Sequence, residues 1–286
     1  METVGQQKLW SFNQRGTKAV PISCTAIRHA NARQVNSFRE LAKLISELQF
    51  MNRDMVLLFR GQPDDYKNRA ENTTIKPKIL RAIDSRKLPT DTELQNRYEV
   101  LAIAEEELVN AYRSSNSAGS TRLRRQQILR WSILQHYEIC ETPLLDVTHS
   151  LRIAASFATK DADDIAYVFV LGVPNLSGAI TASADAGLQI IRLASVCPPS
   201  AVRPHIQEGY LLGEYPEMVG MSQKQHYKHF EIDFGRRLVG KFSFAPKSFW
   251  NASPDFPLIT KSALYPEDDP LLTLKDKVMK KIKELI

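Results

Sequence analysis

The chain has 286 residues, of which 43% are hydrophobic and 24% are charged, a composition typical of a globular protein with a sizeable core. It holds no run of 18 or more apolar residues, and its first residues lack a positive start followed by an apolar segment. The sequence therefore predicts neither a membrane span nor a secretory signal. The net charge of +6 favours an anionic partner such as a nucleic acid, a nucleotide or an acidic protein, although a solvated basic surface is the simpler explanation.

The N-terminal half predicts, in chain order, a strand at residues 20–22, a helix over 31–50, a strand at 55–59, a helix over 91–113 and a helix over 121–137. In the first helix the apolar residues recur at helical spacing, and Asn36 or Ser37 is the expected N-cap. The strand at 55–59 is apolar throughout, as a buried strand would be, and it brings Arg60 to its end. The third helix carries arginines on its exposed face: Arg122, Arg124, Arg125 and Arg130.

The C-terminal half predicts mainly strands, at residues 165–171, 189–196, 203–212, 229–234 and 239–246. Before them, the polar stretch 134–159 indicates a short strand or turn, a pocket rim and then a helix packed by its alanine face. A basic amphipathic helix over 271–286 ends the chain. We see no repeat or interdomain linker. The expected fold is therefore one α+β domain over 31–270, with a mixed or antiparallel β core flanked by helices, behind an N-terminal extension over 1–30.

Arg60 stands out because a charged side chain at the end of a buried strand needs an anionic partner. One interpretation is a structural salt bridge to Asp64 or Asp146. The other is a phosphate clamp, since a guanidinium matches phosphate in bidentate fashion. The neighbouring Gly61 would then let a ligand approach the backbone closely.

His136 also has two interpretations. Near neutral pH it could bind a ribose or act as an acid or base, and equally it could be a structural histidine at a helix end. Asp146 could orient His136, pair with Arg60, or cap the helix that begins near Ser150. We expect an Arg60–Asp146 contact that pins the fold, with His136 at the pocket.

Metal and thiol chemistry have little support in the sequence. His226 and His229 lie three residues apart without a third ligand nearby, so we predict no metal site. Three widely spaced cysteines predict free thiols in a reducing cytoplasm, and Cys140 lacks a basic neighbour that would make it a nucleophile.

Three segments resemble the FRG domain, a family named for the tripeptide that stands here as Phe59-Arg60-Gly61. The segments are LLFRGQ at 57–62, LQHYEICETPLLDVTHSLRIAASFA at 134–158 and RPHIQEGYLL at 203–212. Their order and rough spacing agree with the family pattern. The chain departs from that pattern at four positions, where Glu138 replaces glycine, Pro143 arginine, Val147 tryptophan and Tyr210 phenylalanine.

More distantly, the chain resembles ADP-ribosyltransferases, in which Arg-Gly ends a first strand, a Ser/Thr-x-Ser motif precedes a helix, and a late strand carries a glutamate. This resemblance implies an NAD pocket. For this pocket we expect Glu208, Gln207 and His136 in catalysis, and Arg60, Gly61, Gln135, Tyr137, Thr148 and Ser150 in binding NAD. Gly209 stands where the final glutamate is expected.

The resemblance implies a cytoplasmic enzyme that cleaves NAD at its nicotinamide–ribose bond and modifies a protein or nucleic acid. A bacterial toxin or phage-defence effector, with a regulatory protein partner, is the setting that it suggests. The alternative is a non-catalytic module that binds a nucleotide or a nucleic acid, which the glycine at position 209 favours.

Overall fold

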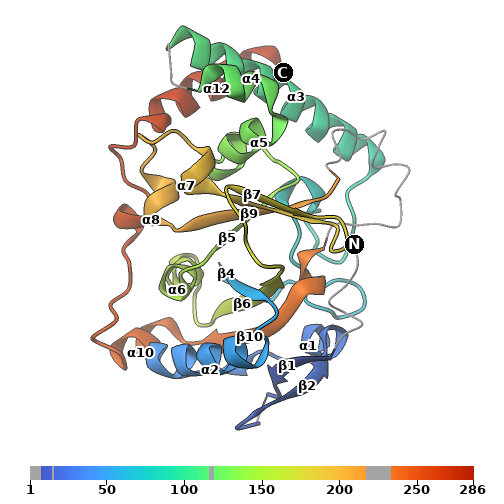
Figure 1. The fold of residues 1–286 in the computed structure, drawn as a ribbon, viewed down its shortest axis with the longest axis vertical. Coiled ribbons are helices and arrows are strands. Elements are labelled where there is room, and N and C mark those ends of the chain that lie inside the picture. Colours follow the sequence, from blue (N-terminus) through green and yellow to red (C-terminus); the bar gives the residue numbers. More distant parts are fainter. Residues whose placement is uncertain (1–7, 15, 116–118, 217–232) are drawn as a thin grey trace.

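The computed structural model describes residues 8–14, 16–115, 119–216 and 233–286 (Figure 1). Its centre is a mixed sheet of eight strands flanked by helices, which confirms the expected α+β class. Among the described strands of this sheet, β3 and β10 pair in parallel and the other neighbours are antiparallel. The order across the sheet is β3 (Arg33–Gln34), β10 (Leu238–Phe244), β6 (Ala166–Val173), β4 (Val56–Gln62), β5 (Leu145–Thr148), β9 (Gly209–Glu214), β8 (Leu188–Arg192) and β7 (Ile180–Ser183).

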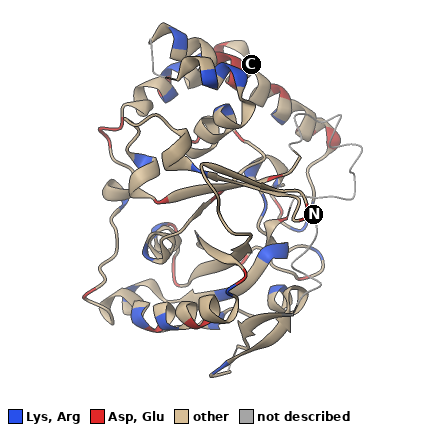
Figure 2. Cartoon of the chain, in the orientation of Figure 1, with Lys and Arg blue, Asp and Glu red and all other residues tan. Residues whose placement is uncertain are grey.

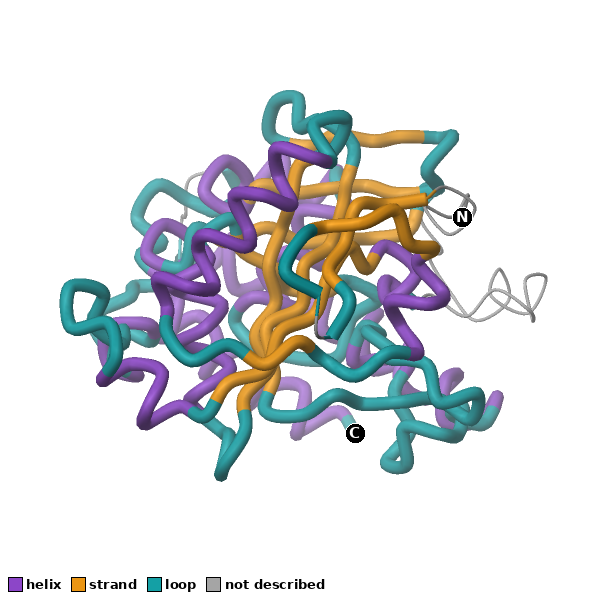
Figure 3. Tube along the Cα trace, turned by 90° about the horizontal axis from the view of Figure 1, so that it is seen from below, coloured by secondary structure: helices purple, strands orange, loops and turns teal. Residues whose placement is uncertain are grey.

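Helices carry many of the charged residues, whereas the central strands are mostly uncharged (Figure 2). They lie on both sides of the strands (Figure 3). Strands β1 (Lys8–Phe12) and β2 (Ala19–Ser23) form a separate antiparallel pair. The helices are α1 (Cys24–His29), α2 (Phe38–Met51), α3 (Asp91–Ser114), α4 (Ser120–Arg125), α5 (Gln127–His136), α6 (Leu151–Lys160), α7 (Leu193–Val196), α8 (Arg203–Ile206), α10 (Pro246–Asn251), α11 (Lys261–Leu264) and α12 (Leu271–Leu285), with 3₁₀ helices η2 (Lys78–Leu80) and η3 (Phe234–Arg237). None of the described helices is long and apolar enough to cross a membrane.

Two of the predicted helices have different bounds in the structure. The first begins only at Phe38, because Ser37 caps it by accepting a 3.1 Å hydrogen bond from the Glu40 N–H. The helix predicted over 121–137 is divided into α4 and α5, because Gln126 between them has an extended backbone. The predicted helices over 91–113 and from 271 are confirmed as α3 and α12.

The prediction of one strand over 203–212 is wrong. Residues Arg203–Ile206 form α8, in which Pro204 occupies the first turn, where its fixed φ suits a helix start. Glu208 follows with a φ of 43°, turning the chain into β9. Polar and apolar residues alternate across both elements, so the pattern resembled a single strand. The strand predicted over 189–196 likewise ends early, since α7 follows β8. The strand predicted over 229–234 lies mostly outside the described residues.

Helix α6 packs on β4 at very close range. Its small residues Ala154, Ala155 and Ala158 are fully buried. A Cβ added to Gly61 would lie 1.9 Å from the Ala154 carbonyl oxygen and 2.6 Å from the Ala158 nitrogen. On the side where a Cβ would stand, the close approach at Gly61 is therefore made by the backbone of a helix. A close approach of a ligand to Gly61 from another side stays a prediction.

The sheet is almost divided between β4 and β5, which share the single residue pair Phe59–Thr148. Further antiparallel pairing would set Gly61 opposite Asp146. Instead, the Asp146 carbonyl oxygen accepts a 2.6 Å hydrogen bond from Arg60 Nη1. Arg60 thus lies inside β4, not at its end as expected, and its side chain replaces a missing backbone bond.

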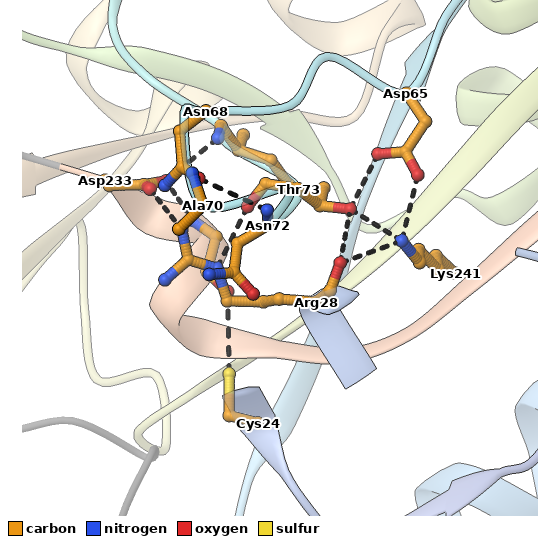
Figure 4. Close-up of polar contacts among 11 residues, drawn as sticks. Cys24, Arg28, Asp65, Asn68, Ala70, Asn72, Thr73, Asp233 and Lys241 are labelled. Atoms are coloured by element: carbon orange, nitrogen blue, oxygen red, sulfur yellow. Dashed lines mark hydrogen bonds and ion pairs between the residues drawn. The ribbon is translucent and has the colours of Figure 1, made fainter. Parts of the chain in front are cut away.

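A buried polar cluster joins α1, β10 and the segment that follows β4 (Figure 4). Lys241 Nζ donates to Asp65 Oδ2 at 2.9 Å, to Thr73 Oγ1 at 2.6 Å and to the Arg28 carbonyl oxygen at 3.0 Å. Arg28 in turn pairs with Asp233 at 2.5 Å. Each ammonium proton has an acceptor, as a buried charge requires. The cluster ties α1 to β10, so the described part of the predicted N-terminal extension packs against β10, next to the edge strand β3.

Candidate functional site

A cavity of about 210 Å³ lies where β4 and β5 separate. Its walls come from both strands, from the C-terminal ends of α5 and α6, from α8 with the turn after it, and from Tyr265 after α11. Residues of all three FRG-like segments meet here. The polar and charged residues that line the cavity are Arg60, His136, Glu138, Asp146, Thr148, Lys160, Asp161, Arg203 and Gln207.

Arg60 is a desolvated cation in this wall. Burial, and then the charge of Arg81, lower its pKa to about 10, against the opposing effect of Asp146. Its Nη1 bonds a backbone carbonyl, and its Nε is buried without a hydrogen-bond partner. Within the described part of the chain, neither Asp64 nor the Asp146 carboxylate forms the salt bridge that the sequence suggested. A desolvated guanidinium in this state favours the binding of an anion.

Asp146 is held between Gln135 and His136. Its Oδ2 accepts a 2.6 Å hydrogen bond from Gln135 Nε2, and its Oδ1 lies 3.3 Å from His136 Nδ1. Burial by itself raises the pKa of Asp146, but the bonds from His136 and Gln135, with the charge of Arg60, outweigh burial and lower it. Asp146 lies in β5, so it does not cap α6, although the sequence allowed that role.

The ionised Asp146 determines which ring nitrogen of His136 carries a proton. A carboxylate only accepts hydrogen bonds, so Nδ1 carries the proton and donates it. In a neutral imidazole this leaves Nε2 as an unprotonated acceptor. His136 Nε2 is buried without a hydrogen-bond partner among the described residues, and the residue lines the cavity. The arrangement provides an oriented general base.

The lowered pKa of Asp146 predicts a pH dependence of stability. The unfolded chain takes up the proton first, because its aspartate keeps the ordinary value of 3.8. The contribution is therefore complete well above that value and is lost as pH falls through it towards the folded-state pKa. We expect the stability advantage of the wild type over Asp146→Asn, measured by urea unfolding, to shrink between about pH 6 and about pH 3. An advantage that grows on acidification would contradict this, and the exposed Asp185→Asn is the control for losing one carboxylate.

Arg203 supplies a second guanidinium to the cavity, and the sequence patterns did not single it out as a site residue. It is 4% exposed, and its Nε is buried without a hydrogen-bond partner. Its guanidinium lies 4.6 Å from the ring centre of Tyr265 and 5.2 Å from that of Tyr137, and Nη2 lies 3.6 Å from Glu138 Oε1. Lys160 Nζ also lies over Tyr265, at 4.7 Å. The available signal was that Arg203 opens the third FRG-like segment.

Glu138 occupies a backbone position that favours glycine. With a φ of 55° it follows the C-cap of α5, and the Ile139 N–H donates to the Leu134 carbonyl oxygen at 2.9 Å. This is a Schellman motif, in which the left-handed residue is usually glycine. The structure thus explains why the family pattern has glycine where this chain has Glu138, whose carboxylate reaches Arg203 at the cavity.

Replacing Glu138 with glycine is expected to raise the free energy of unfolding by about 1 kcal/mol, because it relieves the left-handed strain. The lost contact with Arg203 offsets little, since the Glu138 side chain is 61% exposed. Glu138→Ala is the matched control, because it removes the carboxylate and keeps the strain. Equal stability of the two variants in urea unfolding would show that the backbone conformation is not the cause.

Glu208 does not reach the cavity. It is exposed in the turn before β9, and its carbonyl oxygen accepts hydrogen bonds from Thr148 Oγ1 at 3.2 Å and from the His149 N–H at 3.3 Å. Glu208 therefore lies away from this cavity, because the turn after α8 leaves its side chain exposed to solvent, and its expected catalytic role stays a prediction. Gln207 lines the cavity, with its Nε2 donating to the Leu264 carbonyl oxygen at 2.7 Å.

At the place of the expected late glutamate, a side chain would fit only if Leu193 shifted. A Cβ on Gly209 would lie 2.7 Å from Leu193 Cδ1 and 3.5 Å from His136 Cε1. The carboxylates at the cavity are instead those of Asp146, Glu138 and Asp161.

The remaining predicted site residues are divided between the cavity and its supports. Thr148 lines the cavity, and its Oγ1 donates to the Gln207 carbonyl oxygen at 2.7 Å. Gln135 acts through Asp146 and does not line the cavity. Tyr137 is buried with its hydroxyl donating to Asp269 at 2.8 Å, and Ser150 lies at the N-terminus of α6 beside a different, more open groove.

Among the residues that the structure describes, the other reactive groups offer no competing site. Burial raises the pKa of Cys140 to about 12, so its thiol is protonated at neutral pH. Over the described ranges, no group of three His, Cys, Asp or Glu side chains is arranged to hold a metal ion. His226 and His229 lie outside those ranges.

Comparison with known proteins supports one family. Neither the curated proteins nor the solved structures gave a significant match to this chain. A family model matched residues 56–166, a segment that supplies Arg60, His136, Glu138 and Asp146 to the cavity. Residues 56–166 thus match the FRG domain, and the comparison supports the presence of this domain in the chain.

Proposed function

We propose that the cavity binds a nucleotide, with NAD as the ligand that the sequence resemblance favours. The observation that carries the proposal is the Arg60 guanidinium, part-buried in a split of the sheet and bonded to a backbone carbonyl, with no carboxylate paired to it in the described chain. Arg203 adds a second guanidinium at the same cavity, and this residue is buried. Phosphate oxygens accept paired hydrogen bonds from such groups and supply the missing negative charge.

In the proposed reaction, the bond between the nicotinamide nitrogen and ribose C1′ breaks, and nicotinamide leaves with the bonding electrons. An acceptor oxygen or nitrogen from water, a protein or a nucleic acid bonds to C1′ and gives up a proton. Asp146, ionised at neutral pH, stabilises the positive charge that develops on the ribose. His136 Nε2 takes the acceptor's proton. Asp146 thus assumes the role that the resemblance gave to a late-strand glutamate.

Incubation of the purified chain with NAD labelled in its adenylate phosphate tests the proposal. We expect release of nicotinamide together with labelled ADP-ribose or a labelled acceptor, and Asp146→Asn should bind NAD while forming no product. NAD that raises the melting temperature without any product would support the alternative, a binding module without turnover. If NAD neither bound nor gave a product, the nucleotide site would be rejected altogether.

The toxin or defence setting belongs to the same proposal and has its own test. Expression of the wild-type chain in bacteria should lower cellular NAD and arrest growth, and Asp146→Asn should do neither. Growth arrest by both variants would separate any toxicity from NAD cleavage.

A nucleic-acid acceptor is the second candidate, and the basic surface at one end of the molecule favours it. Arg122, Arg124 and Arg125 of α4 are exposed, whereas Arg130 is used internally, with its Nε 2.7 Å from Glu105 Oε2. Helix α12, which carries exposed lysines, packs on α3 near α4 (Figures 1 and 2). Binding to DNA or RNA through these cations should fall steeply with salt, by about tenfold or more between about 50 and about 200 mM. Salt-insensitive binding would reject this surface.

A further inference from the structure

We propose that the nucleotide site has a second half, a neighbouring cavity of about 220 Å³ beside β4, and that the full ligand is a dinucleotide whose second nucleoside occupies it. The inference rests on the proposed function and specifies its ligand. The second cavity is lined by residues of β4 and of the segment that follows it, among them Gln62, Tyr66, Thr74 and Arg81.

Two buried polar atoms in this second cavity lack partners. Gln62 and Thr74 are each 6% exposed, and both line the cavity. Gln62 Oε1 and Thr74 Oγ1 have no hydrogen-bond partner within the described part of the protein. Leaving such atoms unpaired is destabilising, so native proteins rarely do it. A ligand with N–H or O–H groups would satisfy both, and the edge of a nucleobase and a ribose hydroxyl provide them.

The charge of the second cavity suits a phosphate. Arg81 donates its Nε to the Lys76 carbonyl oxygen at 2.8 Å and forms no ion pair with the described carboxylates. Burial lowers the pKa of Arg81, so its charge, like that of Arg60, is poorly solvated. Lys87 lies at the same cavity, where its contact with Asp84 is long, at 4.0 Å.

The two cavities adjoin along β4. Arg60 and Gln62 are two residues apart in the strand, so their side chains leave the same face about 6–7 Å apart. Arg81 and Arg60 are close enough to interact electrostatically, since the charge of Arg81 contributes to the lowered pKa of Arg60. Asp146 and Tyr66 act on both arginines. Two guanidiniums that repel each other at the junction favour a doubly charged group between them, and a pyrophosphate is one.

The volumes of the two cavities also favour a dinucleotide. Small-molecule sites usually enclose roughly 300–1,000 Å³. Each cavity alone is smaller, at about 210 and 220 Å³, and together they reach that range. Tyr66, which is 40% exposed, lines the second cavity and supplies an aromatic ring for stacking with a base. A mononucleotide would fill only one half.

Calorimetric titration with NAD and with nicotinamide mononucleotide tests the dinucleotide. Wild type should bind NAD at least about tenfold more tightly than the mononucleotide. Gln62→Leu removes the unpaired acceptor and keeps the volume, so it should fold with unchanged or higher stability. It should lower the affinity for NAD by about tenfold and leave the affinity for the mononucleotide unchanged. Tyr66→Ala, a change at a half-exposed side chain, should act in the same way.

The matched control is Gln189→Leu, at a buried glutamine on β8 whose Nε2 donates to the Glu214 carbonyl oxygen at 3.1 Å. It should lower stability and change neither affinity. Equal affinity of wild type for both ligands, or variants at Gln62 and Tyr66 that affect both ligands alike or neither, would overturn the dinucleotide while leaving the first cavity as a nucleotide site. If wild type bound neither NAD nor the mononucleotide, the proposed function would be overturned as well.

Discussion

Replacing Arg60 with alanine is expected to weaken nucleotide binding by at least about 100-fold, the largest functional effect that we predict. A guanidinium can give two charge-assisted hydrogen bonds to a phosphate, and here burial strengthens them because little water competes. The affinity for NAD, measured by calorimetry, is the direct readout. The chain should stay folded, since the substitution removes a poorly solvated charge and leaves one backbone carbonyl, that of Asp146, without its donor.

Two further variants interpret this result. Arg60→Lys keeps the charge without the planar fork, so its affinity should fall between those of wild type and alanine. Arg39→Ala is the control for loss of one arginine, because its ion pair with Asp255 is largely exposed. If Arg60→Ala bound NAD as tightly as wild type, Arg60 would be a purely structural link between β4 and β5, and the proposed site would be wrong.

Replacing Gly61 with alanine is expected to lower the free energy of unfolding by about 3 kcal/mol or more, the largest loss of stability among our predictions. The added Cβ would meet the Ala154 carbonyl oxygen at 1.9 Å and the Ala158 nitrogen at 2.6 Å. Both are backbone atoms of a helix, so no side chain can rotate away and α6 itself must shift. Denaturant unfolding with a fixed slope would measure the loss.

Gly172 provides a matched control on the adjacent strand β6. A Cβ there would lie 2.7 Å from Met55 Sδ and 2.8 Å from Val239 Cγ2, and these are side-chain atoms that can adjust. Gly172→Ala should therefore cost less, about 1–2 kcal/mol. If both alanine variants cost the same, the close packing of α6 on β4 would not be the reason for glycine in the Phe-Arg-Gly tripeptide.

Arg60→Ala and Gly61→Ala together separate the roles of two neighbouring residues in that tripeptide. Strand alternation directs successive side chains to opposite faces of the sheet. Gly61 allows the helix to approach one face, whereas Arg60 reaches across the split towards Asp146. Binding should therefore depend on Arg60 and folding on Gly61, although the two are adjacent in the sequence.

Local patterns in the sequence were sufficient for much of the fold. The apolar stripes of α3 and α12 and the apolar runs of β4 and β6 predicted these elements within a few residues. Such patterns report short-range geometry, which the helical and strand periods impose on any buried face. They failed at 203–212, where a four-residue helix and a turn kept the alternation of a strand.

The site depended more on tertiary structure. Sequence resemblance named Arg60, His136 and Gln207, and all three line the cavity, but it also named Glu208, which points away. A single φ of 43° decides that difference, and no composition or spacing encodes it. Arg203 opens the third FRG-like segment, but it was identified as a site residue from its place at the cavity, over Tyr265.

By itself, then, the sequence determined the α+β class, most of the long elements and the three segments from which the cavity is built. Only the tertiary structure decided that β4 and β5 separate after one residue pair, that Asp146 is held between Gln135 and His136, and that a second cavity adjoins the first. The physical reason is the separation along the chain of the residues that interact. Helical and strand periods are set by neighbours along the chain, whereas a cavity is set by where strands fail to pair and by which distant side chains take the place of the missing bonds.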